Sequence, residues 1–259
     1  RCQPVTGVQT CALPIFAMLV CIVIVAGGVG KGIERACKIL MPALFILLLV
    51  LIVRAVTLPG AREGIVFYLK PDFSKLTGKS VLDALSQGFF SLSLGMGIMI
   101  TYGSYIAKDD NLPGSAMMVL GLDTLIAFLA GLAIFPAVFA MGVEPSQGVG
   151  LTFVALPGIF AKMPMGAFFC FLFFLLLFVA ALTSMISLLE VAVSFIMDEF
   201  HWSRSKSAWL GGIFITLLGV PSTLSFTGSP TVFGKGFFDF MDYISNSILM
   251  PSCAIGISL

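Results

Sequence analysis

The sequence predicts an all-α integral membrane protein, and three observations lead to that fold class. Apolar residues make up 59% of the 259-residue chain, whereas charged residues make up only 10%. The mean hydropathy is +1.10. Apolar residues also gather in runs close to the ~20 residues that a helix needs to cross a bilayer. Because a soluble domain usually carries about 25% charged residues, this surplus of apolar side chains belongs in lipid.

The charge and the reactive side chains argue against several other classes. The formal net charge is +1, so no overall field attracts nucleic acid. The six cysteines are scattered and form no CxxC pair, so we expect neither a metal site of that kind nor a disulfide framework. The single histidine, His201, lies in a polar connector, which leaves almost no material for His-based catalysis.

The chain divides into a short leading segment and a membrane domain. Residues 1–16 have a mixed composition, no clear period and no initiating methionine, so we expect them to be non-native or unstructured. Residues 17–259 form an incomplete transmembrane domain. Its expected spans are the end of one span at 16–26, full spans at 39–58, 81–106, 116–141, 167–197 and 208–226, and the start of a last span at 237–259.

The first spans are defined by their apolar runs and by the connector between them. Residues 16–26 and 39–58 are almost uniformly apolar. The connector 27–38 is basic, and we interpret its glycine-rich beginning, residues 27–32, as a turn between the two spans.

The later spans each carry one distinguishing feature. The run 81–106 has a glycine-rich middle, and 116–141 carries one charge. The run 167–197 is long enough to cross with tilt, 208–226 has a Gly-Val-Pro interruption near its end, and 237–259 begins a last span. Six aromatic residues lie near span ends, where interface aromatics gather: Tyr68, Tyr102, Tyr105, Trp202, Trp209 and Tyr243.

The glycine-rich middle of 81–106 is the first candidate for function. Ser91, Ser93, Gly95 and Gly97 lie within seven residues of one another. Each glycine weakens a helix, and lipid offers no partners to the backbone groups that an unwound turn exposes. Ions and a zwitterionic ligand would satisfy those groups. The alternative is close helix packing through small residues.

Asp123 is the second candidate, since it is a lone carboxylate inside the run 116–141. A charge there costs about 2.5–3.5 kcal/mol on insertion scales, and no Lys or Arg in that run can pair with it. A bound cation would neutralise it. The alternatives are a protonated carboxyl group and a structural hydrogen bond to a neighbouring helix.

A group of small and hydroxylated residues on 167–197 is the third candidate. Ala180, Thr183 and Ser184 have the spacing i, i+3, i+4 and therefore share one helix face. Hydroxyl and carbonyl oxygens suit hard cations such as Na⁺. The alternative is that the hydroxyls bond their own helix backbone. Glu190, further along, is either a buried structural acceptor or part of a gate or proton path.

Five stretches of the sequence resemble the neurotransmitter:sodium symporter family. The stretches KGIER (31–35), KILMP (38–42) and LKPDF (69–73) resemble the region around that family's fifth span. The stretch SQGFFSLSLGMGIMITYGSY (86–105) resembles its sixth, broken span, and FVAALTSMISLLE (178–190) its eighth. The resemblance implies part of an inverted five-plus-five repeat fold of the LeuT-like type. The chain would run from the end of the fourth span to the tenth, with a broken helix near residues 91–97.

The resemblance also implies which residues bind. The expected substrate-binding residues are Phe90, Ser91, Ser93, Met96, Ser184 and Leu188. Two sodium sites are implied, one with Ser91 and Asp123 and one with Ala180, Thr183 and Ser184. The resemblance further implies that the first and third spans of the parent chain, which complete the pocket in this family, are missing from this sequence.

The implied function is sodium-coupled import of an amino acid through the cell (inner) membrane by a multi-pass protein. Sodium ions would be transported, with no organic cofactor and no covalent chemistry, and the partners would be the amino acid, Na⁺ and the lipid bilayer. Met96 indicates a roomy apolar pocket and hence a hydrophobic or aromatic substrate. Eukaryotic members have Asn where this chain has Asp123, and the fixed carboxylate indicates independence from chloride.

Three other functions compete with this one. A proton-coupled transporter of a related five-plus-five fold would use Glu190 and Asp123. A receptor or scaffold on the same fold would bind without transporting. An intramembrane enzyme is disfavoured, because the chain has one histidine outside the spans and one clear mid-span aspartate.

Overall fold

The computed structural model describes residues 7–70, 72–107, 110–140, 142, 165–225, 231–232 and 235–258. The chain divides into two compact units. Unit 1 comprises Arg1–Cys37, Leu82–Asp110 and Leu182–Leu259. Unit 2 comprises Lys38–Val81 and Asn111–Ala181.

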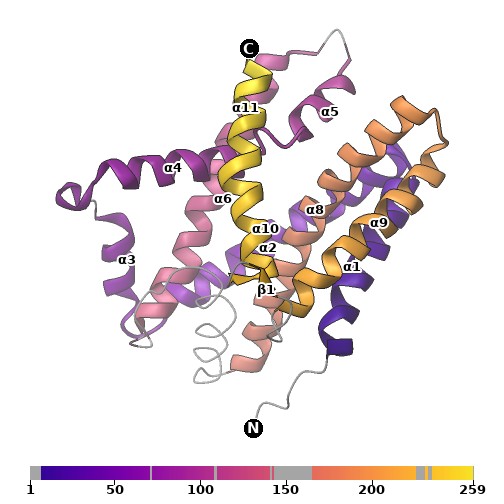
Figure 1. The fold of residues 1–259 in the computed structure, drawn as a ribbon. Helices are drawn as coiled ribbons and strands as arrows, with labels where there is room; N and C mark the ends of the chain where they lie inside the picture. The colour runs from indigo at the N-terminus through magenta and orange to yellow at the C-terminus, as the bar shows by residue number, and fades with distance from the viewer. Residues whose placement is uncertain are drawn as a thin grey trace. The chain divides into compact units, whose positions relative to one another are not determined.

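The described residues are almost entirely helical (Figure 1). The first half of the chain forms α1 (Gly7–Ala26), the π-helix η1 (Val29–Glu34), α2 (Arg35–Val56), α3 (Ala61–Leu69), the 3₁₀ turn η2 (Phe73–Lys75), α4 (Gly78–Ser91) and α5 (Ile98–Ser104). The second half forms α6 (Leu112–Ala140), α8 (Gly166–Phe200), α9 (Arg204–Ser225), β1 (Thr231–Val232), β2 (Lys235–Gly236), α10 (Phe237–Tyr243), the π-helix η4 (Ile244–Leu249) and α11 (Met250–Ser258). The two short strands pair antiparallel, with Thr231 opposite Gly236.

The apolar runs predicted to cross the membrane are helices. Within the described residues, four helical stretches are long and apolar enough to span a bilayer: Val29–Val56, Leu112–Ala140, Gly166–Phe200 and Arg204–Ser225. Each contains most of a predicted span. The run 81–106 is instead divided between α4 and α5, and 237–258 forms α10, η4 and α11 in succession.

Two segments differ from the sequence-based expectation. The segment 27–32 is not a simple turn, because the π-helix η1 already begins at Val29 and runs directly into α2. Helix α1 begins at Gly7, so residues 7–16 are helical rather than unstructured. Because α1 extends back to Gly7, most of the backbone N–H and C=O groups of residues 7–16 are hydrogen-bonded within the helix, as an apolar environment favours. The non-native origin of residues 1–16 stays a prediction, and residues 1–6 lie outside the described part of the chain.

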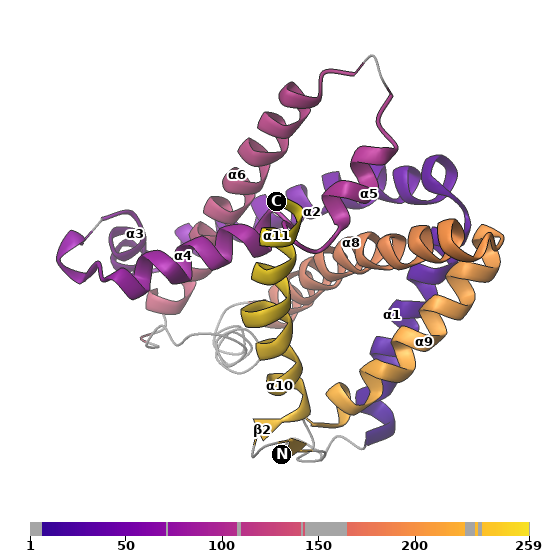
Figure 2. The ribbon, with the colours of Figure 1, turned by 45° about the horizontal axis from the view of Figure 1, so that its top comes forward.

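Unit 1 is built on the close packing of α1 against α9, which run side by side (Figures 1 and 2). Small residues on α9 permit the approach. A Cβ at Gly212 would lie 2.3 Å from Cγ1 of Ile22, and Ser207 and Ala208 are fully buried. Small residues at a helix contact are the usual way for membrane helices to approach closely.

Unit 2 is built on the packing of α3 against the end of α6. A Cβ at Gly64 would lie 2.5 Å from the carbonyl oxygen of Phe135, and one at Gly131 would lie 2.2 Å from Cζ of Tyr68. The Tyr68 hydroxyl donates to the carbonyl of Phe128 at 3.2 Å, and the Tyr68 ring stacks on Phe135 with centroids 5.1 Å apart. Burial raises the pKa of Tyr68, so its hydroxyl remains a donor. Gly64 and Gly131 therefore allow α3 to pack closely against α6.

Candidate functional site

The membrane helix predicted at 81–106 is broken where the sequence indicated. Helix α4 ends at Ser91 and α5 begins at Ile98. Between them the backbone turns through positive φ at Ser93 (56°), Gly95 (81°) and Gly97 (78°). A positive φ is uncommon for a residue other than glycine, so Ser93 marks a backbone that its surroundings hold in place. The predicted break near 91–97 is confirmed.

Tertiary packing explains why glycines occupy the break. A Cβ at Gly95 would lie 2.6 Å from the carbonyl oxygen of Met250, and one at Gly97 would lie 3.1 Å from Cγ1 of Val191. The break therefore approaches the start of α11 on one side and α8 on the other. Glycine allows both the positive φ and the close approach.

The six predicted substrate-binding residues all lie in unit 1. Phe90 and Ser91 end α4, and Ser93 and Met96 lie in the break. Ser184 and Leu188 lie one turn apart on α8. Phe90 and Leu188 are each 48% exposed, whereas Ser93 and Met96 are partly buried.

The predicted sodium ligands lie in different parts of the molecule. Ala180, Thr183 and Ser184 share one face of α8, as their spacing required. Asp123 lies near the middle of α6 and is partly buried. Asp123 belongs to unit 2, whereas Ser91 belongs to unit 1.

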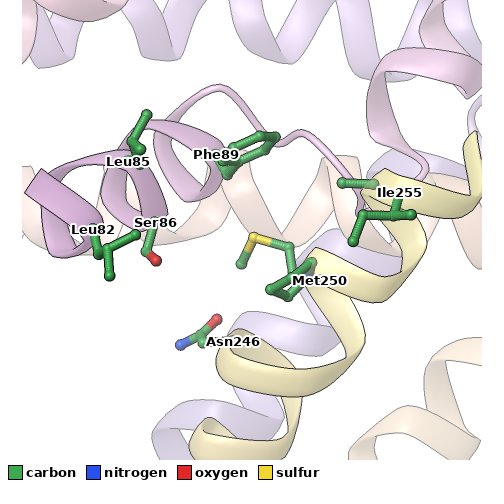
Figure 3. A pocket seen from close by; sticks show the side chains of 9 residues that line it. Leu82, Leu85, Ser86, Phe89, Asn246, Met250 and Ile255 are labelled. Atoms are coloured by element: carbon green, nitrogen blue, oxygen red, sulfur yellow. The ribbon is translucent and has the colours of Figure 1, made fainter. Parts of the chain in front are cut away.

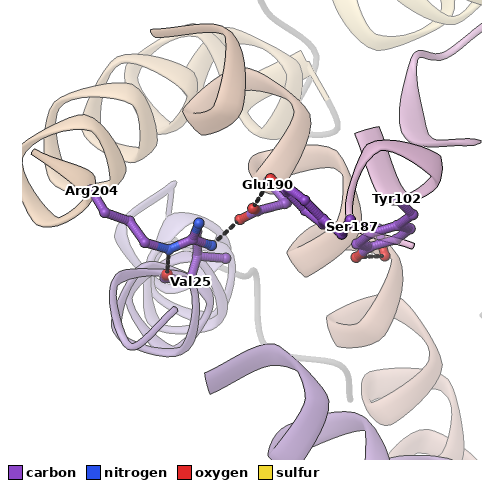
Figure 4. Close-up of polar contacts among 6 residues, drawn as sticks. Val25, Tyr102, Ser187, Glu190 and Arg204 are labelled. Atoms are coloured by element: carbon purple, nitrogen blue, oxygen red, sulfur yellow. Dashed lines mark hydrogen bonds and ion pairs between the residues drawn. The ribbon is translucent and has the colours of Figure 1, made fainter. Parts of the chain in front are cut away.

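Sequence reasoning missed a polar connection between α5 and α8 (Figure 4). The Tyr102 hydroxyl donates to Oγ of Ser187 at 2.9 Å. The Ser187 hydroxyl in turn donates to the carbonyl of Thr183 at 3.2 Å. One turn further along both helices, the Tyr105 hydroxyl donates to Oε1 of Glu190 at 2.6 Å. Tyr102 and Tyr105 are thus hydrogen-bonded to a neighbouring helix, a role beyond that of interface aromatics.

The Glu190 carboxylate is the centre of the second contact. Glu190 is fully buried, and its Oε2 is hydrogen-bonded and ion-paired to Nη2 of Arg204 on α9. Nε of Arg204 donates to the carbonyl of Val25 at 2.9 Å, close to the end of α1 (Figure 4). A cation there complements the negative end of the helix dipole. Glu190 is thus a buried hydrogen-bond acceptor, and a role for it in a gate or proton path stays a prediction.

The matching i, i+3 spacings on the two helices are the only sequence signal for this connection. Tyr102 and Tyr105 lie three residues apart on one helix, as Ser187 and Glu190 do on the other. Such spacing puts each pair on one face. It does not show that the two faces meet.

A separate cavity of about 410 Å³ lies between α4 and the helices η4 and α11 (Figure 3). Its volume is in the range of small-molecule pockets. Ser86 and Asn246 supply the polar side chains, and the rest of the lining is apolar: Leu82, Leu85, Phe89, Met250, Pro251, Ala254 and Ile255. None of the six predicted substrate-binding residues lines it, so we do not assign the amino acid to this cavity.

The chain is similar to sodium-dependent transporters. The sequence profile of the sodium:neurotransmitter symporter family matches residues 5–258. An uncharacterized sodium-dependent transporter of Bacillus subtilis, YhdH, is 43% identical over 254 residues, which cover 97% of this chain and 56% of YhdH. An uncharacterized sodium-dependent transporter of Haemophilus influenzae is 45% identical over 241 residues, which cover 92% of this chain and 52% of the relative.

A solved structure has the same fold. The crystal structure of MhsT in complex with L-phenylalanine matches with a TM-score of 0.86 and 49% sequence identity, over 96% of this chain and 58% of MhsT. This match confirms the predicted LeuT-like fold. The chain spans about half the length of the relatives it matches.

Proposed function

The chain belongs to the sodium:neurotransmitter symporter family, and we propose that the protein carrying it imports an amino acid through the cell (inner) membrane together with Na⁺. The family is one of membrane transporters and not of enzymes. The observation that carries the proposal is the break at residues 92–97 inside an apolar helix. Such a break is useful in a membrane only where something other than lipid satisfies the exposed backbone.

In the proposed binding site, the break binds the polar groups of the amino acid, and the residues around the break contact its apolar side chain. Backbone carbonyls at the end of α4 bind the ammonium group of the amino acid and Na⁺, because a helix carries partial negative charge at its C-terminal end. Ser93 and Ser184 supply hydroxyls. Phe90, Met96 and Leu188 surround the apolar side chain of the amino acid. The protein's first and third spans would complete the site.

The proposed sodium ligands divide into two sets. Thr183 and Ser184 offer hydroxyl oxygens and Ala180 a carbonyl oxygen, on one face of α8. Ser91 and Asp123 form the second set. Oxygen atoms are the ligands that hard cations prefer. Sodium entering down its gradient would favour the state that also holds the amino acid, because a ligand shifts a conformational equilibrium toward the state it binds better.

We propose a hydrophobic or aromatic amino acid as the substrate. Met96 is unbranched and flexible, and such side chains adapt to apolar ligands of different shape. The MhsT structure contains L-phenylalanine, and at 49% identity that ligand supports the same substrate class here.

We also propose that transport is independent of chloride, since Asp123 supplies a fixed negative charge. Replacing chloride by gluconate should leave uptake by the wild-type protein unchanged. Asp123→Asn should lower uptake at least tenfold in gluconate. Wild-type uptake that collapses in gluconate would contradict chloride independence.

The test of the function is uptake by the full-length protein in proteoliposomes. A panel of radiolabelled amino acids is offered with and without an inward Na⁺ gradient. Accumulation that requires the gradient supports the proposal and identifies the substrate. Uptake that follows a pH gradient without Na⁺ would assign the protein to proton-coupled transport. Binding without uptake would favour a receptor or scaffold.

The contacts of Glu190 support the proposal of sodium rather than protons as the coupling ion. Glu190, the buried acid that a proton path would use, is ion-paired with Arg204 and accepts a hydrogen bond from Tyr105. Each oxygen of the carboxylate is therefore already engaged in a contact with a neighbouring side chain.

A further inference from the structure

Ser187 is hydrogen-bonded to two different parts of unit 1 at once. Its Oγ accepts from the Tyr102 hydroxyl at 2.9 Å and donates to the Thr183 carbonyl at 3.2 Å. A serine hydroxyl has one proton and two acceptor lone pairs, so both bonds form together and run in one direction, from Tyr102 through Ser187 to Thr183. Figure 4 shows the Tyr102 and Ser187 side chains pointing toward each other.

The two ends of this hydrogen-bond chain belong to different functional segments. Tyr102 lies in α5, the short helix that directly follows the break containing Ser93 and Met96. Thr183 lies beside Ser184 on the face of α8 proposed to bind sodium. Because hydrogen bonds in a partly buried setting are stronger than in water, the orientation of α5 is tied to that of the α8 turn.

We propose that Tyr102 and Ser187 are positioning residues that couple sodium binding on α8 to amino-acid binding at the break. This inference rests on the function proposed above. Sodium bound to the Thr183 and Ser184 hydroxyls fixes the conformation of that turn of α8. Ser187 is hydrogen-bonded to the Thr183 carbonyl of the same turn, and Tyr102, bonded to Ser187, thereby fixes the orientation of α5. Coupling of this kind is reciprocal. Sodium therefore raises amino-acid affinity by the factor by which the amino acid raises sodium affinity.

The second contact between the same helices makes the inference testable. Tyr105 and Glu190 hold α5 against α8 one turn further along, and Gly97 allows α5 to begin close to Val191. Loss of the Ser187 hydroxyl therefore leaves α5 packed against α8 but removes its hydrogen-bonded connection to the Thr183 carbonyl.

The test measures binding of radioactive sodium to the full-length protein, with and without the amino acid that the uptake panel identifies. The ratio of the two sodium affinities is the coupling factor. Ser187→Ala and Tyr102→Phe should each lower it about three- to tenfold, which is about 0.7–1.4 kcal/mol at 1.4 kcal/mol per tenfold. The double variant should lower it no further, since both changes break one connection. Ser187→Thr keeps the hydroxyl and should retain most of the coupling.

Ser207→Ala is the matched control. Like Ser187, Ser207 donates its Oγ proton to the carbonyl four residues earlier, that of Ser203, at 3.2 Å. Ser207 is fully buried, whereas Ser187 is partly buried. It lies on α9, and its substitution should leave the coupling factor unchanged. A coupling factor that is also unchanged in Ser187→Ala and Tyr102→Phe would overturn the inference while leaving the proposed function intact. Wild-type protein that binds no sodium would overturn the proposed function, and this inference with it.

Discussion

At the scale of single residues, Glu190 shows how a charge is accommodated inside this protein. Its side chain is fully buried, while that of its partner Arg204 is 20% exposed. Burying a charge is tolerated when it is paired and hydrogen-bonded, and the Tyr105 hydroxyl supplies a further bond. The carboxylate therefore joins α5, α8 and α9 in one unit.

Glu190→Gln should destabilise the protein, because it leaves the Arg204 guanidinium without its counter-charge. Breaking a fully buried pair costs about 3–5 kcal/mol, and the partial exposure of Arg204 reduces the expected loss to about 2–3 kcal/mol. Thermal unfolding in detergent would show a lower Tm. Glu199→Gln, an exposed carboxylate on the same helix, is the control and should change stability by less than about 0.5 kcal/mol. Equal Tm values for the two variants would contradict this role.

At the scale of helices, two glycine contacts decide how elements meet. Gly95 lets the break approach Met250, and Gly131 lets the Tyr68 ring lie on α6. At Gly95 an added Cβ would collide with a backbone carbonyl, and at Gly131 with the ring of Tyr68, whose hydroxyl is bonded to the Phe128 carbonyl. The same residue type thus shapes the candidate binding site in unit 1 and the α3–α6 contact in unit 2.

Gly95→Ala should impair amino-acid binding more than it impairs folding. The substitution puts a Cβ 2.6 Å from the Met250 carbonyl at a φ of +81°, so the break must shift. We expect at least a tenfold loss of affinity in a scintillation proximity assay on the full-length protein. Gly88→Ala is the control, because a Cβ there meets nothing within 4 Å. If Gly95→Ala bound as tightly as Gly88→Ala, the break would not be the binding element.

Gly131→Ala should loosen α3 from α6, because the added Cβ would lie 2.2 Å from the Tyr68 ring. Overpacking of this kind costs about 1–3 kcal/mol. Trypsin cleavage after Arg62, near the start of α3, should become faster. Gly121→Ala lies on the same helix with nothing within 4 Å of its Cβ and should leave the cleavage rate unchanged. Equal rates in both variants would show that α3 does not depend on this contact.

At the scale of the whole molecule, the chain spans about half the length of the relatives it matches, and we propose that other segments of the full-length protein contribute to the binding site. The match to MhsT covers 58% of that protein, and the resemblance places the first and third spans outside this sequence. We expect residues 1–259 alone to bind amino acid at least a hundredfold more weakly than the full-length protein. Equilibrium binding in detergent, with and without sodium, measures the difference. Full affinity in residues 1–259 would show that the missing spans are dispensable.

The sequence alone determined the fold class and the position of the break. Hydropathy is a local property, so the apolar runs located the membrane helices to within a few residues, apart from the earlier starts at Gly7 and Val29. Gly95 and Gly97 weaken a helix but left close helix packing as an alternative, and the resemblance to the family's sixth span led to the prediction of a break. The roles of Phe90, Ser184 and Asp123 came from the family resemblance and stay predictions.

Only the tertiary structure decided which helix faces meet. The sequence shows that Tyr102 and Tyr105 share a face, as do Ser187 and Glu190, but their pairing depends on how α5 lies against α8. The sequence also could not identify Arg204 as the partner of Glu190, because Arg204 begins a different helix after a polar connector. Contacts between separate helices are set by packing of the whole unit, whereas periodicity describes one helix at a time.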